Sequence, residues 1–266
     1  MIKIIVCLKL IIDPEAPFVT FKINEEAMKP IPPEGSPPVI SPFDENALEA
    51  ALKIKDQQDC KITIISLGRS LPKAILQRAL AVGADEVVAL EGPEFEDLDA
   101  FNTAQALAKA INKVGGFDLV FTGRQAADWD SGLVWAGIAE LLDIPSITIA
   151  SKAEVKDGKA IVERVATDGI EILEADMPVL INFSNEVGEL RYFSLPALMK
   201  AKKKEITKWS GSDIQLEPLN VMEVGDLYIP DLGLVDCEFI DGDSPVEKGQ
   251  ELARKLAEEG IIIKKA

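Results

Sequence analysis

The chain has 266 residues, 47% of them hydrophobic, and a formal net charge of −17 at pH 7. Its length allows one large domain or two small ones, and its acidic balance argues against nucleic acid or anionic membranes as partners, because phosphates are neutralised by clustered Lys and Arg. Its apolar runs are shorter than the roughly 20 residues of a membrane-spanning helix, so we expect no membrane insertion.

The sequence contains no histidine, which removes Ser-His-Asp and Cys-His catalysis and most zinc or haem sites. Cys7, Cys60 and Cys237 form no C-x-x-C motif, so an iron–sulfur cluster or a four-cysteine zinc site is excluded. Scattered cysteines, and an N-terminus that resembles a buried strand more than a signal peptide, predict a cytoplasmic protein. Any redox chemistry would depend on an organic cofactor.

Strand and helix patterns alternate through the first two thirds of the chain. The predicted strands are Lys3–Leu8, Lys61–Leu67, Glu86–Ala89 and Phe117–Phe121, and the predicted helices are Glu45–Lys55, Leu71–Ala81, Ala100–Val114 and Ser131–Leu142. Val19–Ile23 is a strand-like excursion, and the five prolines of Met28–Pro38 predict a loop. The alternation predicts an α/β fold with a mostly parallel sheet and helices on both faces.

The pattern changes after Ser146. Strands are predicted at Ser146–Val155, Lys159–Val165, Gly169–Glu174 and Pro178–Phe183, with Asp157-Gly158 as a hairpin turn and a short helix after Ser194. Ser210–Asp241 has weak periodicity and predicts an extended arm. Ser244–Glu247 is a capping box for a last helix, which Gly260 ends. We expect an α/β domain over residues 1–209, and an arm with its helix over residues 210–266.

The loop Thr122–Asp130 joins a buried strand to an amphipathic helix. Such junctions bind ligands in α/β proteins, because the loop amides and the helix N-terminus point to one spot. Arg124 would pair with phosphate, and Gln125 would contact a base or a flavin edge. Asp128 and Asp130 would repel a pyrophosphate unless they bind ribose hydroxyls or cap backbone amides.

An ordinary surface loop is the alternative for this segment, with Asp130 or Ser131 capping the next helix. Trp129 and Trp135 flank the helix start and would stack on a ligand ring or pack against a neighbouring element, of which packing is the commoner arrangement. Residue spacing leaves both readings open.

Other polar strand ends are expected beside this loop, since the carboxyl ends of parallel strands share one edge. Ser41–Asp44 lies near the end of the first strand, and Ser66–Gly68 ends another. The alternatives are that Asp44 caps its helix and that Cys7 is a core residue.

The run Lys200–Lys204 stands out in an acidic chain, although such runs are usually solvated faces. It follows the apolar segment Leu195–Met199. Exposed apolar residues beside positive charge form docking surfaces, so this segment is a candidate for contact with a partner.

Several segments together resemble the β subunit of electron transfer flavoproteins. In chain order they are Cys7–Lys9 (CLK), Ser41–Ala51 (SPFDENALEAA), Ala79–Asp85 (ALAVGAD), Gly123–Asp130 (GRQAADWD), Ser151–Val155 (SKAEV) and Arg191–Lys202 (RYFSLPALMKAK). The likeness runs in register from residue 1 to about residue 215, which makes it a specific match.

The resemblance implies a Rossmann-like fold and a heterodimer with a larger α subunit that carries FAD. It implies a bound adenine nucleotide, which is AMP in most members and a second FAD, reduced by NADH, in the electron-bifurcating branch. The family's nucleotide contacts fall on Cys7, Ser41, Pro42, Phe43, Asp44, Leu67, Gly123, Arg124, Gln125, Ala126, Ala127, Asp128, Trp129, Asp130, Ser131, Gly132, Leu133 and Val134. Its docking anchor for flavin-containing dehydrogenases falls on Leu195, beside Lys200, and ferredoxin is a further candidate partner.

The motif Gly123–Ala126 resembles the bifurcating branch, because Lys is commoner than Arg in AMP-binding members; the last helix also fits that branch. The chain departs from the family at Leu133 and Trp135, where Gln and Gly are usual, at Ile11–Asp13, where V-P-D is usual, and in its longer proline-rich loop. The leading expectation is an electron-bifurcating subunit that uses FAD and NADH, with no acid, base or metal supplied by the chain. The alternatives are an AMP-binding scaffold and a non-redox nucleotide sensor.

Overall fold

A computed structural model describes residues 1–17, 21–217, 222–230 and 237–261 of the chain. The chain divides into two compact units, Met1–Leu227 and Tyr228–Ala266. The first unit contains the sheet and five of the described α-helices, and the second contains α6 (Pro245–Glu258). The predicted boundary at residues 209 and 210 stays a prediction.

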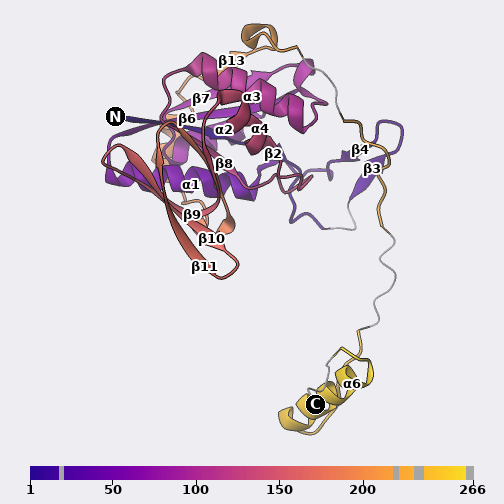
Figure 1. Cartoon of the computed structure of the whole chain (residues 1–266). Helices are drawn as coiled ribbons and strands as arrows, with labels where there is room; N and C mark the ends of the chain where they lie inside the picture. Colours follow the sequence, from indigo (N-terminus) through magenta and orange to yellow (C-terminus); the bar gives the residue numbers. More distant parts are fainter. Residues whose placement is uncertain (18–20, 218–221, 231–236, 262–266) are drawn as a thin grey trace. The chain divides into compact units, whose positions relative to one another are not determined.

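The first unit is built on one nine-stranded sheet with the order β11-β10-β9-β12-β8-β1-β6-β7-β13 (Figure 1). Its strands are β1 (Ile2–Cys7), β6 (Cys60–Gly68), β7 (Glu86–Glu91), β8 (Leu119–Gly123), β9 (Ser146–Lys156), β10 (Lys159–Ala166), β11 (Gly169–Asp176), β12 (Val179–Phe183) and β13 (Thr207–Trp209). All neighbours are parallel except the pairs that β10 makes with β9 and β11. The mostly parallel α/β sheet predicted from the sequence is confirmed.

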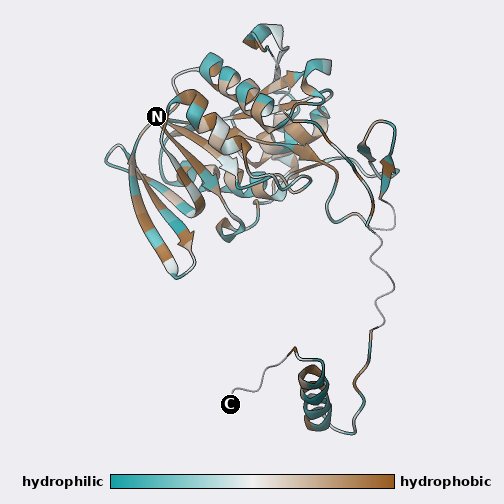
Figure 2. Cartoon of the chain, turned by 45° about the vertical axis from the view of Figure 1, so that its right-hand side comes forward, coloured by the Kyte–Doolittle hydropathy of each residue, from teal (hydrophilic) through white to brown (hydrophobic). Residues whose placement is uncertain are grey.

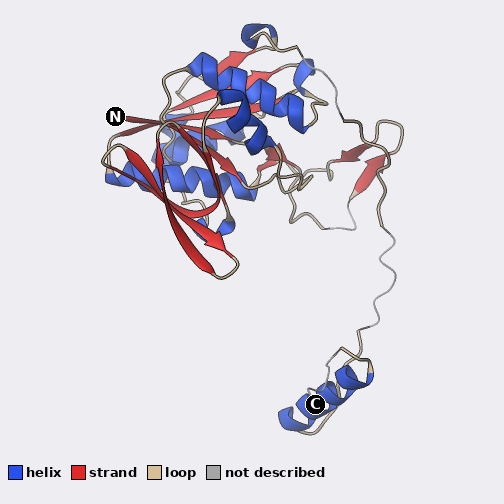
Figure 3. Cartoon of the chain, in the orientation of Figure 1, coloured by secondary structure: helices blue, strands red, loops and turns tan. Residues whose placement is uncertain are grey.

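Helices cover both faces of this sheet (Figure 3). One face carries α1 (Pro42–Gln57), α2 (Lys73–Val82) and α5 (Leu195–Ala201), and the other carries α3 (Ala100–Val114) and α4 (Val134–Leu142). Side chains alternate across a strand, so Ile4 and Val6 of β1 enter the first core while Ile5 and Cys7 enter the second. Because both faces are buried, the central strands are nearly continuous apolar runs, brown in Figure 2.

The hairpin turn and the last helix form as predicted. Asp157 and Gly158 have φ angles of 51° and 80°, the left-handed pair that a tight β-hairpin turn requires. The Ser244 hydroxyl accepts a hydrogen bond from the Glu247 amide at 3.2 Å, and the Glu247 carboxylate accepts one from the Asp243 amide at 2.9 Å. None of the described helices has the length and apolar composition that a bilayer-spanning segment requires.

Several predicted boundaries are wrong. The proline-rich segment predicted as a loop contains β4 (Lys29–Ile31), which pairs with β3 (Lys22–Asn24). Directly after that segment, β5 (Val39–Ile40) pairs with β2 (Leu10–Ile11). Proline is tolerated in such short strands, where few amides take part in a ladder. Of the predicted excursion Val19–Ile23, residues 19 and 20 lie outside the described residues.

Candidate functional site

The N-terminus of α1 meets the carboxyl ends of β1 and β8, and the Asp44 carboxylate joins all three. Its Oδ2 accepts a hydrogen bond from the Lys9 amide at 2.7 Å, and its Oδ1 accepts one from the Gly123 amide at 3.1 Å. The alternative in which Asp44 caps its helix is therefore wrong, since the N-cap position is Ser41. Asp44 is instead a clasp between elements far apart in the sequence.

Burial raises the pKa of Asp44 to about 7, against the opposing effect of the backbone donors Lys9 and Gly123. Desolvation disfavours the charged carboxylate, whereas hydrogen bonds to it favour the charge, and here desolvation dominates. The clasp is thus a titratable group within the physiological range.

Ser41 also connects these segments. Its amide donates to the Lys9 carbonyl at 2.9 Å, and its hydroxyl accepts from the Ala127 amide at 3.4 Å. The Lys9 ammonium forms an ion pair with Asp128 at 2.7 Å. The structure therefore brings the predicted Ser41–Asp44 segment, the end of β1 and the predicted loop into one place.

Side chains within the loop also hold one another. The Arg124 Nε donates to the Gln125 Oε1 at 3.2 Å, and the Gln125 Nε2 donates to the Asp130 Oδ1 at 2.7 Å. Asp130 and Gly132 have φ angles of 50° and 60°, so two left-handed residues turn the chain toward α4. Asp128 and Asp130 therefore already accept hydrogen bonds within the loop region, from Lys9 and Gln125 respectively.

Arg124 lies with its guanidinium 5.0 Å from the centre of the Phe43 ring, a cation–π contact. Its amide donates to the Phe183 carbonyl at 2.8 Å, which fixes its backbone at the end of β12. Within the described part of the chain its guanidinium forms no ion pair within 4 Å, although its charge contributes, after the Ser184 hydrogen bond, to lowering the pKa of Glu186. A guanidinium held this way suits a phosphate or a carboxylate, to which it can donate two parallel hydrogen bonds.

The helix after the loop begins later than predicted. α4 starts at Val134 after Leu133, and no side chain caps it, so the predicted caps Asp130 and Ser131 are wrong. The amides of its first turn lack partners within the helix and carry no side-chain cap, which leaves them available to an anion. Trp135 packs on the core with α3, as predicted, whereas Trp129 is 52% exposed.

Cys7 lies at the end of β1 in the core, two positions before Lys9. Burial, followed by the nearby Asp44 carboxyl, raises the pKa of its thiol well above the usual range. The core alternative for Cys7 fits this environment, and its role as a nucleotide contact stays a prediction. Leu67 lies at the same edge on β6, two residues after Ile65, which pairs with Cys7.

The thiols should react in a fixed order. Cys237 is exposed, whereas Cys7 and Cys60 are buried with raised pKa values, so alkylation at pH 8 should modify Cys237 first and the other two only on unfolding. Mass spectrometry of iodoacetamide-treated protein, with and without denaturant, checks this order. Modification of Cys7 in the folded chain at a rate similar to that of Cys237 would contradict it.

The predicted docking residues lie on α5, which packs on α2. Leu195 is 76% exposed, and Lys200 is also exposed. Arg191 fixes the entry to this helix, because its guanidinium donates to the buried Glu49 at 2.9 Å and to Asp56 at 2.8 Å. The segment that leads into α5 is thus anchored on α1, while α5 itself packs on α2.

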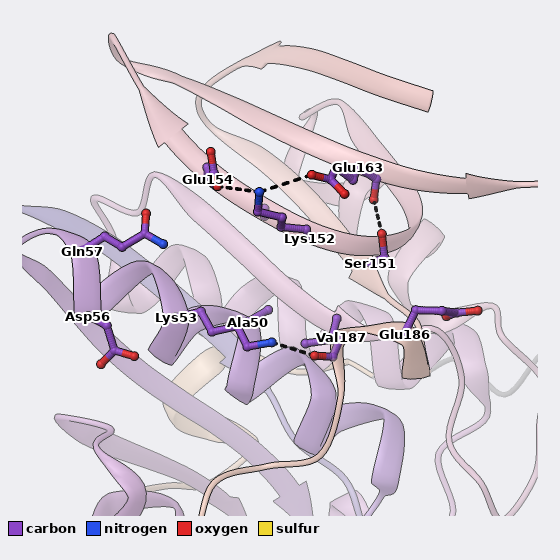
Figure 4. Close-up of a pocket in the computed structure, with 11 residues that line it drawn as sticks. Ala50, Lys53, Asp56, Gln57, Ser151, Lys152, Glu154, Glu163, Glu186 and Val187 are labelled. Atoms are coloured by element: carbon purple, nitrogen blue, oxygen red, sulfur yellow. Dashed lines mark hydrogen bonds and ion pairs between the residues drawn. The ribbon is translucent and has the colours of Figure 1, made fainter. Parts of the chain in front are cut away.

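A cavity of about 390 Å³ lies between α1 and the strands β9 and β10 (Figure 4). None of the predicted nucleotide contacts lines it. Lys53 donates to the Val187 carbonyl at 2.7 Å, and Lys152 pairs with Glu154 at 2.7 Å. Both lysines are engaged within the protein, so we assign no ligand to this cavity.

Comparison with known proteins identifies the family. Residues 34–214 match the electron transfer flavoprotein domain. The chain is 42% identical to "Electron transfer flavoprotein subunit beta" of Thermoanaerobacterium thermosaccharolyticum, over 69% of this chain and 71% of the relative. The chain belongs to the electron transfer flavoprotein β-subunit family. It is also 37% identical to "Caffeyl-CoA reductase-Etf complex subunit CarD" of Acetobacterium woodii, over 86% of this chain and 90% of the relative.

A third relative is "Acryloyl-CoA reductase electron transfer subunit gamma" of Anaerotignum propionicum, 33% identical over 68% of this chain and 69% of the relative. The family and fold implied by the sequence motifs are therefore confirmed. Two residues that organise the site were not among the predicted contacts: Lys9, which bonds to Asp44 and Asp128, and Asn182, whose Nδ2 donates to the Gly123 carbonyl at 2.9 Å. Asn182 carried a signal, since it is a polar residue inside the apolar strand β12.

Proposed function

We propose that this chain is the β subunit of a heterodimeric electron transfer flavoprotein and holds FAD at Gly123–Val134, with NADH as its electron donor. Electrons would pass to the FAD of the α subunit and to a partner dehydrogenase, with ferredoxin as a further candidate acceptor. Bound FAD supplies the exchange between hydride and single-electron transfer. A cytoplasmic location, inferred from the scattered cysteines, belongs to the same proposal.

The observation that carries this proposal is the anion-binding character of one loop. Arg124 presents a guanidinium without an ion-pair partner among the described residues, and the uncapped N-terminus of α4 follows in the same loop. Both features favour a diphosphate. In addition, the buried Thr122 hydroxyl, in the residue before Gly123, has no hydrogen-bond partner within the described chain. This hydroxyl could therefore bond to a ligand or a water.

Each residue of the loop would contact a different part of the nucleotide. Arg124 and the first-turn amides of α4 would hold the phosphates, and Gln125 would contact a ring edge. Asp128 would accept a hydrogen bond from a ribose hydroxyl with the same carboxylate that pairs with Lys9. No side chain would transfer a proton, which suits a chain without histidine.

An AMP-binding scaffold is the second candidate, since the same loop chemistry accepts AMP. The nucleotide content of the purified heterodimer separates the two. Two FAD per heterodimer would support the bifurcating subunit, whereas one FAD and one AMP would support the scaffold. A chain that is stable and functional without an α subunit would instead support a non-redox nucleotide sensor.

Substitution of Arg124 by alanine should weaken nucleotide binding about 10- to 100-fold, because a hydrogen-bonded charged contact contributes roughly 1.5–3 kcal/mol and each 1.4 kcal/mol is a factor of about ten. Titration of the nucleotide-free heterodimer with FAD and with AMP measures the effect. Arg69→Ala is the matched control, since Arg69 is an exposed arginine whose partner is Glu96. Unchanged affinity, flavin content and flavin potential in Arg124→Ala would remove Arg124 from the site.

Partner contacts complete the proposal. Leu195 and Lys200 on α5 would dock the dehydrogenase. In the second unit, none of the described side chains of α6 is buried, and Val246 and Leu252 are exposed apolar residues on it. An amphipathic helix of this kind fits a role of residues 210–266 in contacting the α subunit.

A further inference from the structure

The Gly123 peptide is held by side chains on both of its polar groups. Its amide donates to the Asp44 carboxylate at 3.1 Å, and its carbonyl accepts from the Asn182 Nδ2 at 2.9 Å. A Cβ at this position would lie 2.6 Å from the carbonyl carbon of Phe43, so the backbone of α1 also presses on it. The position of the Gly123 backbone is therefore fixed, and the predicted nucleotide loop begins at this residue.

Asn182 belongs to β12 and is only 1% exposed. Its second polar atom, Oδ1, accepts a hydrogen bond from the Ile149 amide in β9 at 3.2 Å. One side chain therefore links the carboxyl end of β8 to the fourth residue of β9 through the strand between them. Both of its interactions are made inside the protein, where an unsatisfied amide is costly.

The β9 end of this link is irregular. Ile181 pairs with Ile147 and Phe183 pairs with Ala150, so two residues of β9 lie opposite the single residue Asn182, which defines a β-bulge. Ile149, in this bulge, has a φ of 56°, a left-handed conformation that a β-branched side chain rarely adopts. The Asn182 Oδ1 accepts the hydrogen bond from the Ile149 amide in this bulge.

We propose that Asn182 is a positioning residue for the nucleotide loop, which it ties to the β9 bulge through the Gly123 carbonyl. This inference rests on the proposed nucleotide site. Arg124 follows Gly123 directly, so rotation of the Gly123 peptide changes the direction in which the guanidinium leaves the sheet. Thr122 pairs with Asn182 in the β8–β12 register, so the two side chains lie on the same face of the sheet. The buried Thr122 hydroxyl has no partner among the described residues.

Asn182→Asp tests the link selectively. The ionised side chain keeps an acceptor for the Ile149 amide and has no donor for the Gly123 carbonyl, whereas a protonated carboxyl would still donate, so Asn182→Leu, which has no donor at any pH, decides the result. Asn182→Leu is the uncharged companion if the buried carboxylate prevents folding. Asn112→Asp, the same chemical change on the exposed surface of α3, is the matched control.

The measurement is the Kd of the nucleotide-free heterodimer for AMP and for FAD, with thermal unfolding recorded in parallel. We expect at least a tenfold weaker Kd for Asn182→Asp or Asn182→Leu and less than a twofold change for Asn112→Asp. A double-mutant cycle with Arg124→Ala should be non-additive, because the two residues act on the same phosphate contact. A role in stability alone would lower the Tm and leave the Kd and the cycle unaffected.

The outcomes separate the two proposals. A wild-type heterodimer that binds neither AMP nor FAD overturns the proposed function and this inference with it. Tight wild-type binding together with an unchanged Kd in the folded Asn182 variants overturns the positioning role alone. Weakened binding with an additive cycle also overturns it, since the effect would then not pass through the loop.

Discussion

Gly123→Ala should lower the free energy of unfolding by about 3 kcal/mol, the upper end of the usual cost of overpacking. The added methyl would lie 2.6 Å from the Asp44 Oδ1 and 2.8 Å from the Asp44 amide nitrogen, far inside van der Waals contact. Neither neighbour can give way cheaply. One is the backbone of the first turn of α1, and the other is a buried carboxylate already bonded to Lys9 and Gly123. Relief of the clash therefore opens the clasp.

Urea denaturation of the purified protein, with the nucleotide content measured in parallel, checks this result. Gly225→Ala is the matched control, because nothing lies within 4 Å of a Cβ at that position and its φ is not left-handed. We expect the control to stay within about 0.5 kcal/mol of the wild type, as surface substitutions usually do. A similarly small change for Gly123→Ala would show that β8 and α1 approach less closely than the structure indicates.

The order of strands and helices could be predicted from the sequence because it depends on local periodicity. A buried parallel strand such as β8 is a continuous apolar run, and α3 has apolar residues at helical spacing from Ala100 to Val114. Helix starts were predicted less well. Asp44 and Asp130 have the chemistry of capping residues, but their carboxylates accept hydrogen bonds from Gly123 and Gln125 instead.

The location of the site could be predicted in part, because the fold class determines which strand ends lie together. Parallel strands place their carboxyl ends at one edge, so the convergence of Cys7, Ser41–Asp44 and the Gly123 loop followed from the fold class. The bonds that hold the site could not be predicted, because they join distant positions. Asn182 reaches Gly123 across 59 residues, and no local pattern encodes that pairing.

The pH dependence of stability should report on the clasp directly. The folded protein raises the pKa of Asp44 from 3.8 to about 7, so the native state binds a proton that the unfolded chain has released. Stability from this group is therefore fully present below about pH 4 and is lost as the pH rises through about 7. At about 1.4 kcal/mol per pKa unit, the loss is on the order of 4 kcal/mol.

Asp44→Asn removes this titration while keeping one acceptor oxygen for the two amides. The free energy of unfolding of the wild type, relative to that of Asp44→Asn, should therefore fall between about pH 4 and about pH 7 and level off above that. Asp168→Asn, which changes an exposed carboxylate in the turn before β11, is the control and should leave the wild-type curve unchanged. Parallel curves for the wild type and Asp44→Asn would mean that Asp44 keeps its charge throughout. The two amide donors from Lys9 and Gly123 would then outweigh the burial of the carboxylate, and the clasp would be a permanent anion at the floor of the loop.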